Sequence, residues 1–299
     1  MAWPLRSRLA CCKRPEVTLG RLLQETRLSL ESHGVEEAYL EADLFLMKAL
    51  GLDRSRLYSS PERHVTTEER ETLDHDLSRR LNGEPWPYIC GYREFYGLQM
   101  RVGPRVFIPR PETELLVDLA LELARTLPND RQLLIADVCT GSGAIAVALA
   151  VHLPQAVVYA TDVSSSALEM ARVNSQNHYV EGRIILLEGD LLDPVLGQVD
   201  IVVSNPPYVP QADMYHLTRE VRAEPSIALD GGDDGLDVVR SLVPQALSKL
   251  RRPGGLVVEI SPDQGEKVCA LACSLAPEGS CTLHKDMAGR QRAVLVRLT

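Results

Sequence analysis

Apolar residues recur at helical spacing through the first third of the chain. Leucines and alanines three or four positions apart, with charged residues between them, predict helices over residues 19–34 and 36–50. A third helix is predicted to run to residue 81, because Thr66 or Thr67 can serve as its N-cap and acidic residues follow in its first turn. This pattern predicts a small helical domain over residues 1–83.

Residues 84–111 are rich in proline, glycine and aromatic side chains, and they interrupt the helical periodicity. Two short extended pieces around Tyr96-Gly97 predict a β-hairpin within this segment. The segment is either a packed linker between domains or one wall of a binding site, and the two interpretations are compatible.

From residue 112 onward, short apolar runs alternate with amphipathic stretches. Strands are expected over residues 133–138, 157–162, 184–188, 201–204 and 256–260, the last after a turn at 253–255. Helices are expected over residues 144–152, 165–174, 236–250 and 264–275, and two antiparallel strands over 281–285 and 293–298. The alternation predicts an α/β domain over residues 112–299, with a parallel sheet covered by helices on both faces.

The formal net charge of −9 argues against a protein that grips duplex nucleic acid through its phosphates, since such proteins carry a basic surface. A basic protein partner fits the acidic balance better. No apolar run approaches the roughly 20 residues of a membrane span. Residues 1–14 contain four basic residues and no acidic one, which resembles an organellar transit peptide only weakly. We therefore expect a cytoplasmic, monomeric protein without a membrane anchor.

The seven cysteines form no Cys-x-x-Cys pair, and no histidine cluster completes a metal site. We therefore expect no metal, and we expect buried, reduced thiols in a reducing compartment. Cys269 and Cys273 share one face of a predicted helix, so a disulfide or metal role there is the alternative. The histidines form no recognisable catalytic triad, and none is assigned a role.

Residues 137–143 join the first strand of the α/β domain to its helix. The glycines of this loop let the backbone turn sharply and approach a ligand, and the amides at the helix start face that ligand. Asp162, at the end of the second strand, can accept hydrogen bonds from both hydroxyls of a ribose. Residues 141–146 also match the dinucleotide motif G-x-G-x-x-A, so a nicotinamide or flavin enzyme stays a competitor, as does a glycine turn without a ligand.

Two further acids favour S-adenosylmethionine as the cofactor. Asp137 would repel a pyrophosphate but attract the cationic methionine part. Asp190 ends the third strand, where it can accept a hydrogen bond from the exocyclic amine of adenine. Three acids at three successive strand ends suit a cationic cofactor.

Asn205-Pro206-Pro207-Tyr208 follows the fourth strand, and ligands of open α/β sheets bind beyond the carboxyl ends of the strands. The Asn205 side-chain oxygen and the Pro206 carbonyl could each accept one N–H of a planar amide or aromatic amine. The lone pair of that nitrogen would then point at the sulfonium methyl, and such orientation can be worth about 7–11 kcal/mol. Tyr208 could pack flat on the amide. The alternative is an ordinary tight turn.

At these residues the chain resembles the HemK/PrmC family of protein-(glutamine-N5) methyltransferases. The likeness runs along almost the whole chain and includes residues 95–98, 109–114, 141–143 and 205–208, Glu224-Pro225, and Glu259 with Gln264. The Asn-Pro-Pro-Tyr run alone is shared with amino-methylating DNA enzymes. Residues 109–114 are far more specific to this family.

The resemblance implies a helical N-terminal domain that helps to hold the substrate, and a Rossmann-like, seven-stranded class I methyltransferase domain. It implies methyl transfer from S-adenosyl-L-methionine to the glutamine side-chain nitrogen in the Gly-Gly-Gln motif of class 1 peptide chain release factors. The catalytic residues are then Asn205, Pro206 and Tyr208, and Pro207 completes the substrate-binding set. The expected cofactor contacts are Asp137, Cys139, Thr140, Gly141, Ser142, Gly143, Asp162, Asp190 and Asn205.

The chain departs from the family pattern at Cys139, where the family usually has glycine. A positive φ at this position would therefore lower cofactor affinity. Arg110 is predicted to be either a surface charge or a ligand contact, and Glu112 and Glu114 are predicted to begin a helix. Residues 230–235 lack the ligand spacing of an EF-hand and are predicted to form a mobile loop near the mouth of the site.

Three other functions compete with glutamine methylation. An amino-group methyltransferase acting on nucleic acid predicts a basic groove, and the net charge argues against one. A dinucleotide-dependent oxidoreductase predicts binding of reduced nicotinamide and gives residues 205–208 no role. A catalytically silent binding module is suggested only by Cys139.

Overall fold

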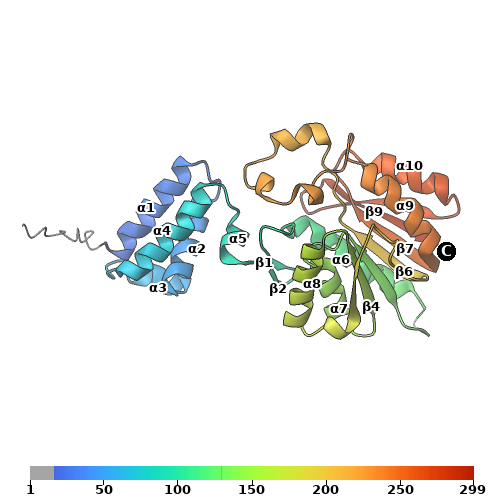
Figure 1. Ribbon diagram of the computed structural model, residues 1–299, viewed down its shortest axis with the longest axis horizontal. Coiled ribbons are helices and arrows are strands. Elements are labelled where there is room, and N and C mark those ends of the chain that lie inside the picture. The colour runs from blue at the N-terminus through green and yellow to red at the C-terminus, as the bar shows by residue number, and fades with distance from the viewer. Residues whose placement is uncertain (1–16, 129) are drawn as a thin grey trace, which may run out of the picture. The chain divides into compact units, whose positions relative to one another are not determined.

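The computed structural model describes residues 17–128 and 130–299, which form two compact units (Figure 1). One unit ends at Ile89 and the other begins at Cys90. The helical unit extends past residue 83 because the Trp86 ring packs edge-on against Phe45, with ring centroids 4.5 Å apart, and Ile89 is buried in the same core. The basic segment 1–14, with its two cysteines, lies outside the described residues.

The first unit is built from helices around a leucine-rich core. Its helices are α1 (Leu19–Ser32), α2 (Ala38–Leu50), α3 (Arg54–Ser59), α4 (Thr67–Leu81) and α5 (Trp86–Cys90). Helix α2 lies beside both α1 and α4, and Leu22, Phe45 and Leu73 are buried in the shared core (Figure 1). Thr66 caps α4 and forms a capping box with Glu69. The sequence does not predict α3, because six residues with one buried side chain carry no detectable period.

The second unit opens with the predicted hairpin, formed by β1 (Tyr92–Phe95) and β2 (Leu98–Arg101). Tyr96 and Gly97 make its turn with φ values of 52° and 71°, as a two-residue hairpin turn of this kind requires. The buried Asn174 side chain bonds to both backbone groups of Arg101 and donates to the Ser142 carbonyl at 2.8 Å. The hairpin is thereby tied to the predicted cofactor loop.

A seven-stranded sheet forms the centre of the second unit (Figure 1). Its strands are β3 (Leu134–Val138), β4 (Val157–Asp162), β5 (Ile184–Glu188), β6 (Val199–Ser204), β7 (Leu250–Glu259), β8 (Ser280–Lys285) and β9 (Gln291–Leu298). Their order across the sheet is β5-β4-β3-β6-β7-β9-β8. The first five of this order run parallel, and β9 is antiparallel to both β7 and β8. The parallel strands and the antiparallel pair at the C-terminus are as the sequence predicts, whereas the strand order comes from the structure.

Helices cover both faces of the sheet. Figure 1 shows α6 (Glu114–Thr126), α7 (Ala144–His152) and α8 (Ser165–Asn177) together on one side, and α9 (Asp237–Lys249) and α10 (Gly265–Leu275) on the other. Alternate residues of a strand serve alternate cores: Ile201 and Val203 pack with α6 and α7, whereas Val202 packs with α9 and α10. Because the central strands are buried on both faces, they read as continuous apolar runs in the sequence.

Short 3₁₀ turns occupy several connections of the second unit. They are η1 (Pro111–Thr113), η2 (Glu181–Arg183), η3 (Gln211–His216), η4 (Val221–Ala223) and η5 (Ser226–Ala228). Helix α6 follows η1 directly, so the predicted helix start is a 3₁₀ turn that continues as an α-helix. In the part of the chain that the structure describes, no helix combines the length and apolarity needed to cross a membrane.

Strand β7 differs from the prediction. It begins at Leu250 and runs through Pro253-Gly254-Gly255, where the sequence predicts a turn. Both glycines pair with β9. A Cβ on Gly255 would lie 2.7 Å from a methyl group of Leu123 on α6. The glycine is therefore explained by the close approach of the helix to the sheet.

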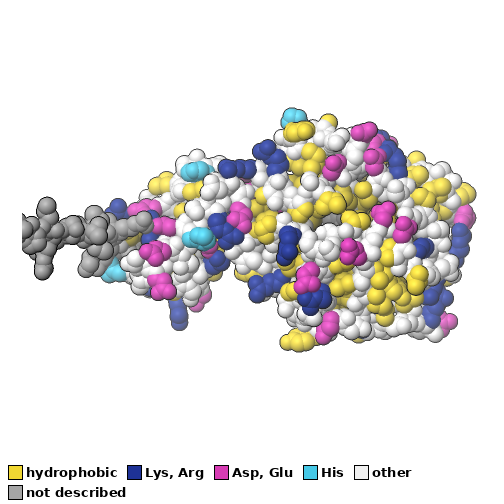
Figure 2. All heavy atoms as spheres, in the orientation of Figure 1, with side chains coloured by type: hydrophobic (Ala, Val, Ile, Leu, Met, Phe, Trp, Pro, Cys, Tyr) yellow, Lys and Arg dark blue, Asp and Glu magenta, His cyan; other side chains and the backbone are white. Residues whose placement is uncertain are grey.

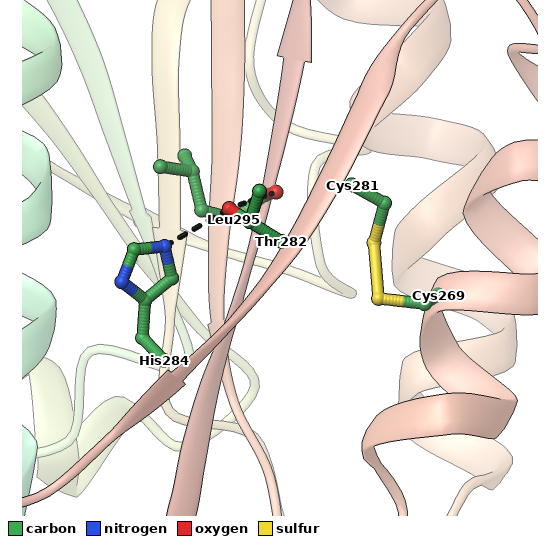
Figure 3. The surroundings of a disulfide bond; sticks show 5 residues. All are labelled: Cys269, Cys281, Thr282, His284 and Leu295. Atoms are coloured by element: carbon green, nitrogen blue, oxygen red, sulfur yellow. Dashed lines mark hydrogen bonds between the residues drawn. A yellow bond between two sulfur atoms is a disulfide. The ribbon is translucent and has the colours of Figure 1, made fainter.

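The prediction of reduced, buried thiols is wrong for the cysteines near the C-terminus. Cys269 on α10 and Cys281 on β8 form a disulfide, with their Cα atoms 5.8 Å apart (Figure 3). Cys273 is exposed. The sequence suggests Cys269 with Cys273 because the two share a helix face. The packing of α10 against β8 brings Cys281 to Cys269 instead.

Candidate active site

The carboxyl ends of β3, β4, β5 and β6 meet at a cavity of about 640 Å³. This volume is in the range of small-molecule sites, about 300–1,000 Å³. The predicted site residues that line it are Cys139, Thr140, Gly141, Ser142, Asp162, Asp190, Asn205, Pro206, Pro207 and Tyr208. The other two predicted residues, Asp137 and Gly143, support the loop that forms this wall.

Three left-handed residues shape the loop between β3 and α7. Cys139, Gly141 and Gly143 have φ values of 59°, 54° and 78°. A Cβ on Gly143 would lie 2.8 Å from the Cβ of Ala171 on α8, so close helix packing requires this glycine. Nothing lies within 4 Å of a Cβ on Gly141, so its backbone conformation alone favours glycine there. Cys139 meets the condition for weakened cofactor binding, because its Cβ stands on a positive-φ backbone.

Asp137 is fully buried at the end of β3. Its Oδ2 accepts hydrogen bonds from the Thr140 hydroxyl at 2.6 Å and the Ala146 N–H at 3.0 Å. Its Oδ1 has no hydrogen-bond partner among the described residues. Burial, with a smaller contribution from the Asp162 carboxylate, raises the pKa of Asp137 to about 7. A buried carboxylate with an unpaired oxygen suits a cationic ligand.

Asp162 ends β4, and Asp190 lies just beyond the end of β5. The Asp162 carboxylate accepts hydrogen bonds from the N–H groups of Gly141 and Ser164, each at 2.9 Å. Burial raises the pKa of Asp162, while these hydrogen bonds lower it. Asp190 is exposed and lines the cavity. The three acids make this edge of the sheet anionic, as the residues of a site for a cationic, hydroxyl-bearing cofactor would.

A chain of hydrogen bonds holds the side chain of Asn205, which follows β6. Its Nδ2 donates to Thr113 Oγ1 at 3.1 Å, and the Thr113 hydroxyl donates to Glu259 Oε2 at 2.7 Å. The Tyr208 hydroxyl donates to the second oxygen of Glu259, Oε1, at 3.1 Å. Three separate segments therefore meet at one carboxylate: η1, the loop after β6 and the end of β7.

Glu259 is buried, and its surroundings set its charge. Burial raises its pKa to about 7, while the Thr113 hydroxyl, the charge of Arg292 and the Tyr208 hydroxyl lower it. Burial and the charge of Glu259 raise the pKa of Tyr208 above its ordinary value, so this side chain is a neutral phenol that can donate a hydrogen bond.

An ion pair joins two walls of the cavity. Arg110 pairs with the buried Glu224, which also accepts a hydrogen bond from the Ile108 N–H at 2.9 Å. The Arg110 guanidinium lies over the Phe107 ring, 4.8 Å from its centroid. Burial raises the pKa of Glu224, and the charge of Arg110 lowers it. Arg110 is therefore a paired residue of the cavity wall.

Residues 230–235 lie beside the cavity, as predicted, but they are packed into its wall. The Gln264 side chain donates to the carbonyls of Tyr208, at 3.0 Å, and Gly235, at 3.1 Å. The N–H of Gly231 donates to the Val209 carbonyl at 2.9 Å. A Cβ on Gly235 would collide with the Tyr208 carbonyl. These contacts do not fit the mobile loop that the sequence predicts.

The sequence assigns no role to Thr113, Glu224 or Glu259, although each belongs to a run that carries the family resemblance. Thr113 is separated from Glu259 by 146 positions, and Arg110 from Glu224 by 114. Local spacing carries no signal for partners so far apart. Only the return of both segments to one edge of the sheet brings these side chains into contact.

Known protein families match both the helical part and the α/β part of the chain. A family model described as the PrmC N-terminal domain matches residues 21–91, and one described as the Methyltransferase small domain matches residues 117–232. The catalytic domain of hMettl16, solved in complex with MAT2A 3′UTR hairpin 6, has the same fold. Its TM-score is 0.55 at 15% identity, over 73% of this chain and 84% of that chain.

Curated relatives match almost the whole chain, and each is named a release factor glutamine methyltransferase. The protein from Moorella thermoacetica is 41% identical over 280 residues, which are 93% of this chain and 98% of that protein. The protein from Geobacter sulfurreducens is 43% identical over 262 residues, 87% of this chain and 90% of that protein. The resemblance inferred from the motifs is confirmed, and the chain belongs to the release factor glutamine methyltransferase family.

Proposed function

We propose that this protein transfers a methyl group from S-adenosyl-L-methionine to the side-chain nitrogen (N5) of the glutamine in the Gly-Gly-Gln motif of class 1 peptide chain release factors. The observation that carries the proposal is the tethered amide of Asn205, held by Thr113 at the wall of a cavity that Asp162 and Asp190 line, with Asp137 buried behind its loop. The names of the curated relatives support the choice of substrate.

The acids at the strand ends fit the cofactor. S-adenosylmethionine supplies an electrophilic methyl group when it is bound. Asp137 Oδ1, a buried acceptor without a partner in the described residues, suits an ammonium group or an ordered water. Asp162 is assigned to the ribose hydroxyls and Asp190 to the adenine amine, with the backbone of residues 139–143 completing the wall. The charge and spacing of these residues favour a cation over a dinucleotide, whose pyrophosphate they would repel.

Asn205 and Pro206 position the glutamine in this proposal. An amide nitrogen is a weak nucleophile because its lone pair is delocalised into the carbonyl. Asn205 Oδ1 and the Pro206 carbonyl each accept one N–H of the glutamine, which turns the nitrogen toward the methyl carbon, and Tyr208 packs on the flat amide. Bound S-adenosylmethionine would supply the methyl group and keep the bonding electrons on its sulfur, and the amide nitrogen that Asn205 and Pro206 hold would lose one proton to water.

The partner in this proposal is a protein, and no nucleic acid or membrane takes part. The net charge of −9 supports this choice. Acidic and basic side chains are interspersed over the visible face of the second unit (Figure 2). We infer a monomer that acts in the cytoplasm, where a release factor is available as substrate.

Labelled methyl transfer tests the function. The protein is incubated with radiolabelled S-adenosylmethionine and either a class 1 release factor, the same factor with its Gly-Gly-Gln glutamine replaced by alanine, or duplex DNA. We expect label on the first alone. Asn205→Ala should lower turnover by about 10²–10³-fold, whereas Asn177→Ala, an exposed asparagine at the end of α8, should not change it. Label on DNA but not on the factor would refute the proposal.

A further inference from the structure

We propose that Thr113 and Glu259 are positioning residues that decide which end of the Asn205 amide faces the substrate. The inference rests on the proposed function, because it concerns the acceptor that holds the glutamine nitrogen. Neither residue is among the predicted catalytic or binding residues. Thr113 lines the cavity and Glu259 lies behind it, so Glu259 acts through its neighbours.

The direction of the hydrogen bonds follows from counting protons. An ionised carboxylate can only accept hydrogen bonds. The two oxygens of Glu259 therefore accept from hydroxyls, one from Thr113 and one from Tyr208. A hydroxyl has one proton, and that of Thr113 is used by Glu259. Thr113 Oγ1 can therefore only accept from Asn205, which requires Nδ2 on that side of the amide. The acceptor Oδ1 is left on the opposite side.

An amide that turned by 180° would lose this arrangement. Nδ2 would then replace Oδ1 as the group offered to the glutamine NH₂, so that a donor faced a donor. The flipped amide would also place Oδ1 against Thr113 Oγ1, whose proton is already committed to Glu259. Thr113 and Glu259 are 4% and 1% exposed, so bulk water cannot replace the lost partner. The network therefore selects one orientation of an otherwise nearly symmetric side chain.

The orientation of the Asn205 amide also depends on the charge of Glu259. If Glu259 were protonated, it could donate to Thr113, and Thr113 could then donate to the oxygen of a flipped Asn205. The charged and titratable groups that face Glu259 are Arg292 on β9, Tyr208 after β6 and Glu112 on η1. Arg292 favours the ionised form, whereas Glu112 and burial oppose it. The turnover rate should accordingly rise with pH as Glu259 ionises, near neutrality.

Three threonine variants separate positioning from folding. Thr113→Val keeps the shape but removes the hydroxyl, Thr113→Ser restores the hydroxyl, and Thr126→Val removes a hydroxyl that bonds only within α6. We expect Thr113→Val to lower kcat on the release factor by about 10–100-fold with the cofactor dissociation constant unchanged, and to lower the melting temperature because Glu259 Oε2 loses its buried partner. Thr113→Ser should recover most of the rate, and Thr126→Val should match the unmodified protein. A loss of rate in Thr113→Val that Thr113→Ser does not recover would overturn the proposal.

Glu259→Gln provides the pH test. A glutamine can accept from only one of the two hydroxyls through its single oxygen, so kcat should fall and its rise near neutral pH should disappear. A pH profile identical to that of the unmodified protein would contradict the assigned role of Glu259.

A readout without substrate keeps this inference separate from the proposed function. The side-chain amide protons of Asn205, assigned by their loss in Asn205→Asp, can be followed by ¹⁵N NMR in the whole protein. We expect slower exchange with water in the unmodified protein and Thr113→Ser than in Thr113→Val. Equal exchange rates would refute the positioning network even if the release factor were methylated. Failure to methylate the factor with the expected exchange pattern would refute only the proposed function.

Discussion

Replacing Asp137 with asparagine should stabilise the cofactor-free protein at neutral pH and weaken cofactor binding. Burial raises the pKa of Asp137 from 3.8 to about 7. At about 1.36 kcal/mol per pKa unit, a shift of about 3 units corresponds to about 4 kcal/mol. The pKa is raised in the folded state, so the protonated Asp137 side chain contributes this free energy to the stability of the unmodified protein. The contribution is complete below about pH 3.8 and is lost as the pH rises to about 7. Asparagine keeps an oxygen for Thr140 and Ala146 but carries no charge to desolvate.

Urea unfolding followed by circular dichroism between about pH 4 and pH 8 measures this effect. The difference in unfolding free energy, Asp137→Asn minus the unmodified protein, should grow by about 4 kcal/mol over that range. Glu259 titrates in the same interval but is present in both proteins, so it cancels in the difference. Calorimetry should show S-adenosylmethionine bound about 10–100-fold more weakly by the variant at pH 8. A difference that does not change with pH would refute the assigned ionisation, and unchanged affinity would refute the role in binding.

Three further substitutions test packing, strain and the disulfide. Cys139→Gly removes a Cβ at positive φ and so relieves a strain of about 1–2 kcal/mol. Calorimetry should then show tighter cofactor binding, and equal or weaker binding would contradict the strain argument. Gly235→Ala should lower the unfolding free energy measured in urea by about 2–5 kcal/mol, because its Cβ would meet the Tyr208 carbonyl. Gly289→Ala, at a similar φ but with open space around it, should cost only about 1–2 kcal/mol, and equal losses would mean that the contact with Tyr208 is unimportant. Cys281→Ser should cost about 3 kcal/mol without reductant by opening a short loop, whereas Cys273→Ser should cost little, and identical stabilities would argue against the disulfide.

Much of the fold could be predicted because its signals are local. The apolar run 157–162 and the helix 144–152 coincide with β4 and α7, and the hairpin turn is at Tyr96-Gly97. These features depend on periodicity, turn chemistry and capping, which neighbouring residues determine. The run Asn205-Pro206-Pro207-Tyr208 and the loop 137–143 were likewise recognisable, because a short motif after a strand carries its own chemistry. Most of the candidate site residues came from such motifs.

What the sequence alone determined is therefore the set of elements, the family and the motifs that surround the cavity. What only the tertiary structure decided is which distant side chains complete them: Thr113 with Glu259, Arg110 with Glu224, and Cys269 with Cys281. Gly255 of β7 is a further example, since a Cβ there would meet Leu123 on α6. Such partners depend on how helices and strands pack, and the free energy of packing is shared by many contacts across the fold. The residues of one short segment do not determine this packing, so the hydrogen bonds that orient Asn205 could not be predicted from its neighbours in the sequence.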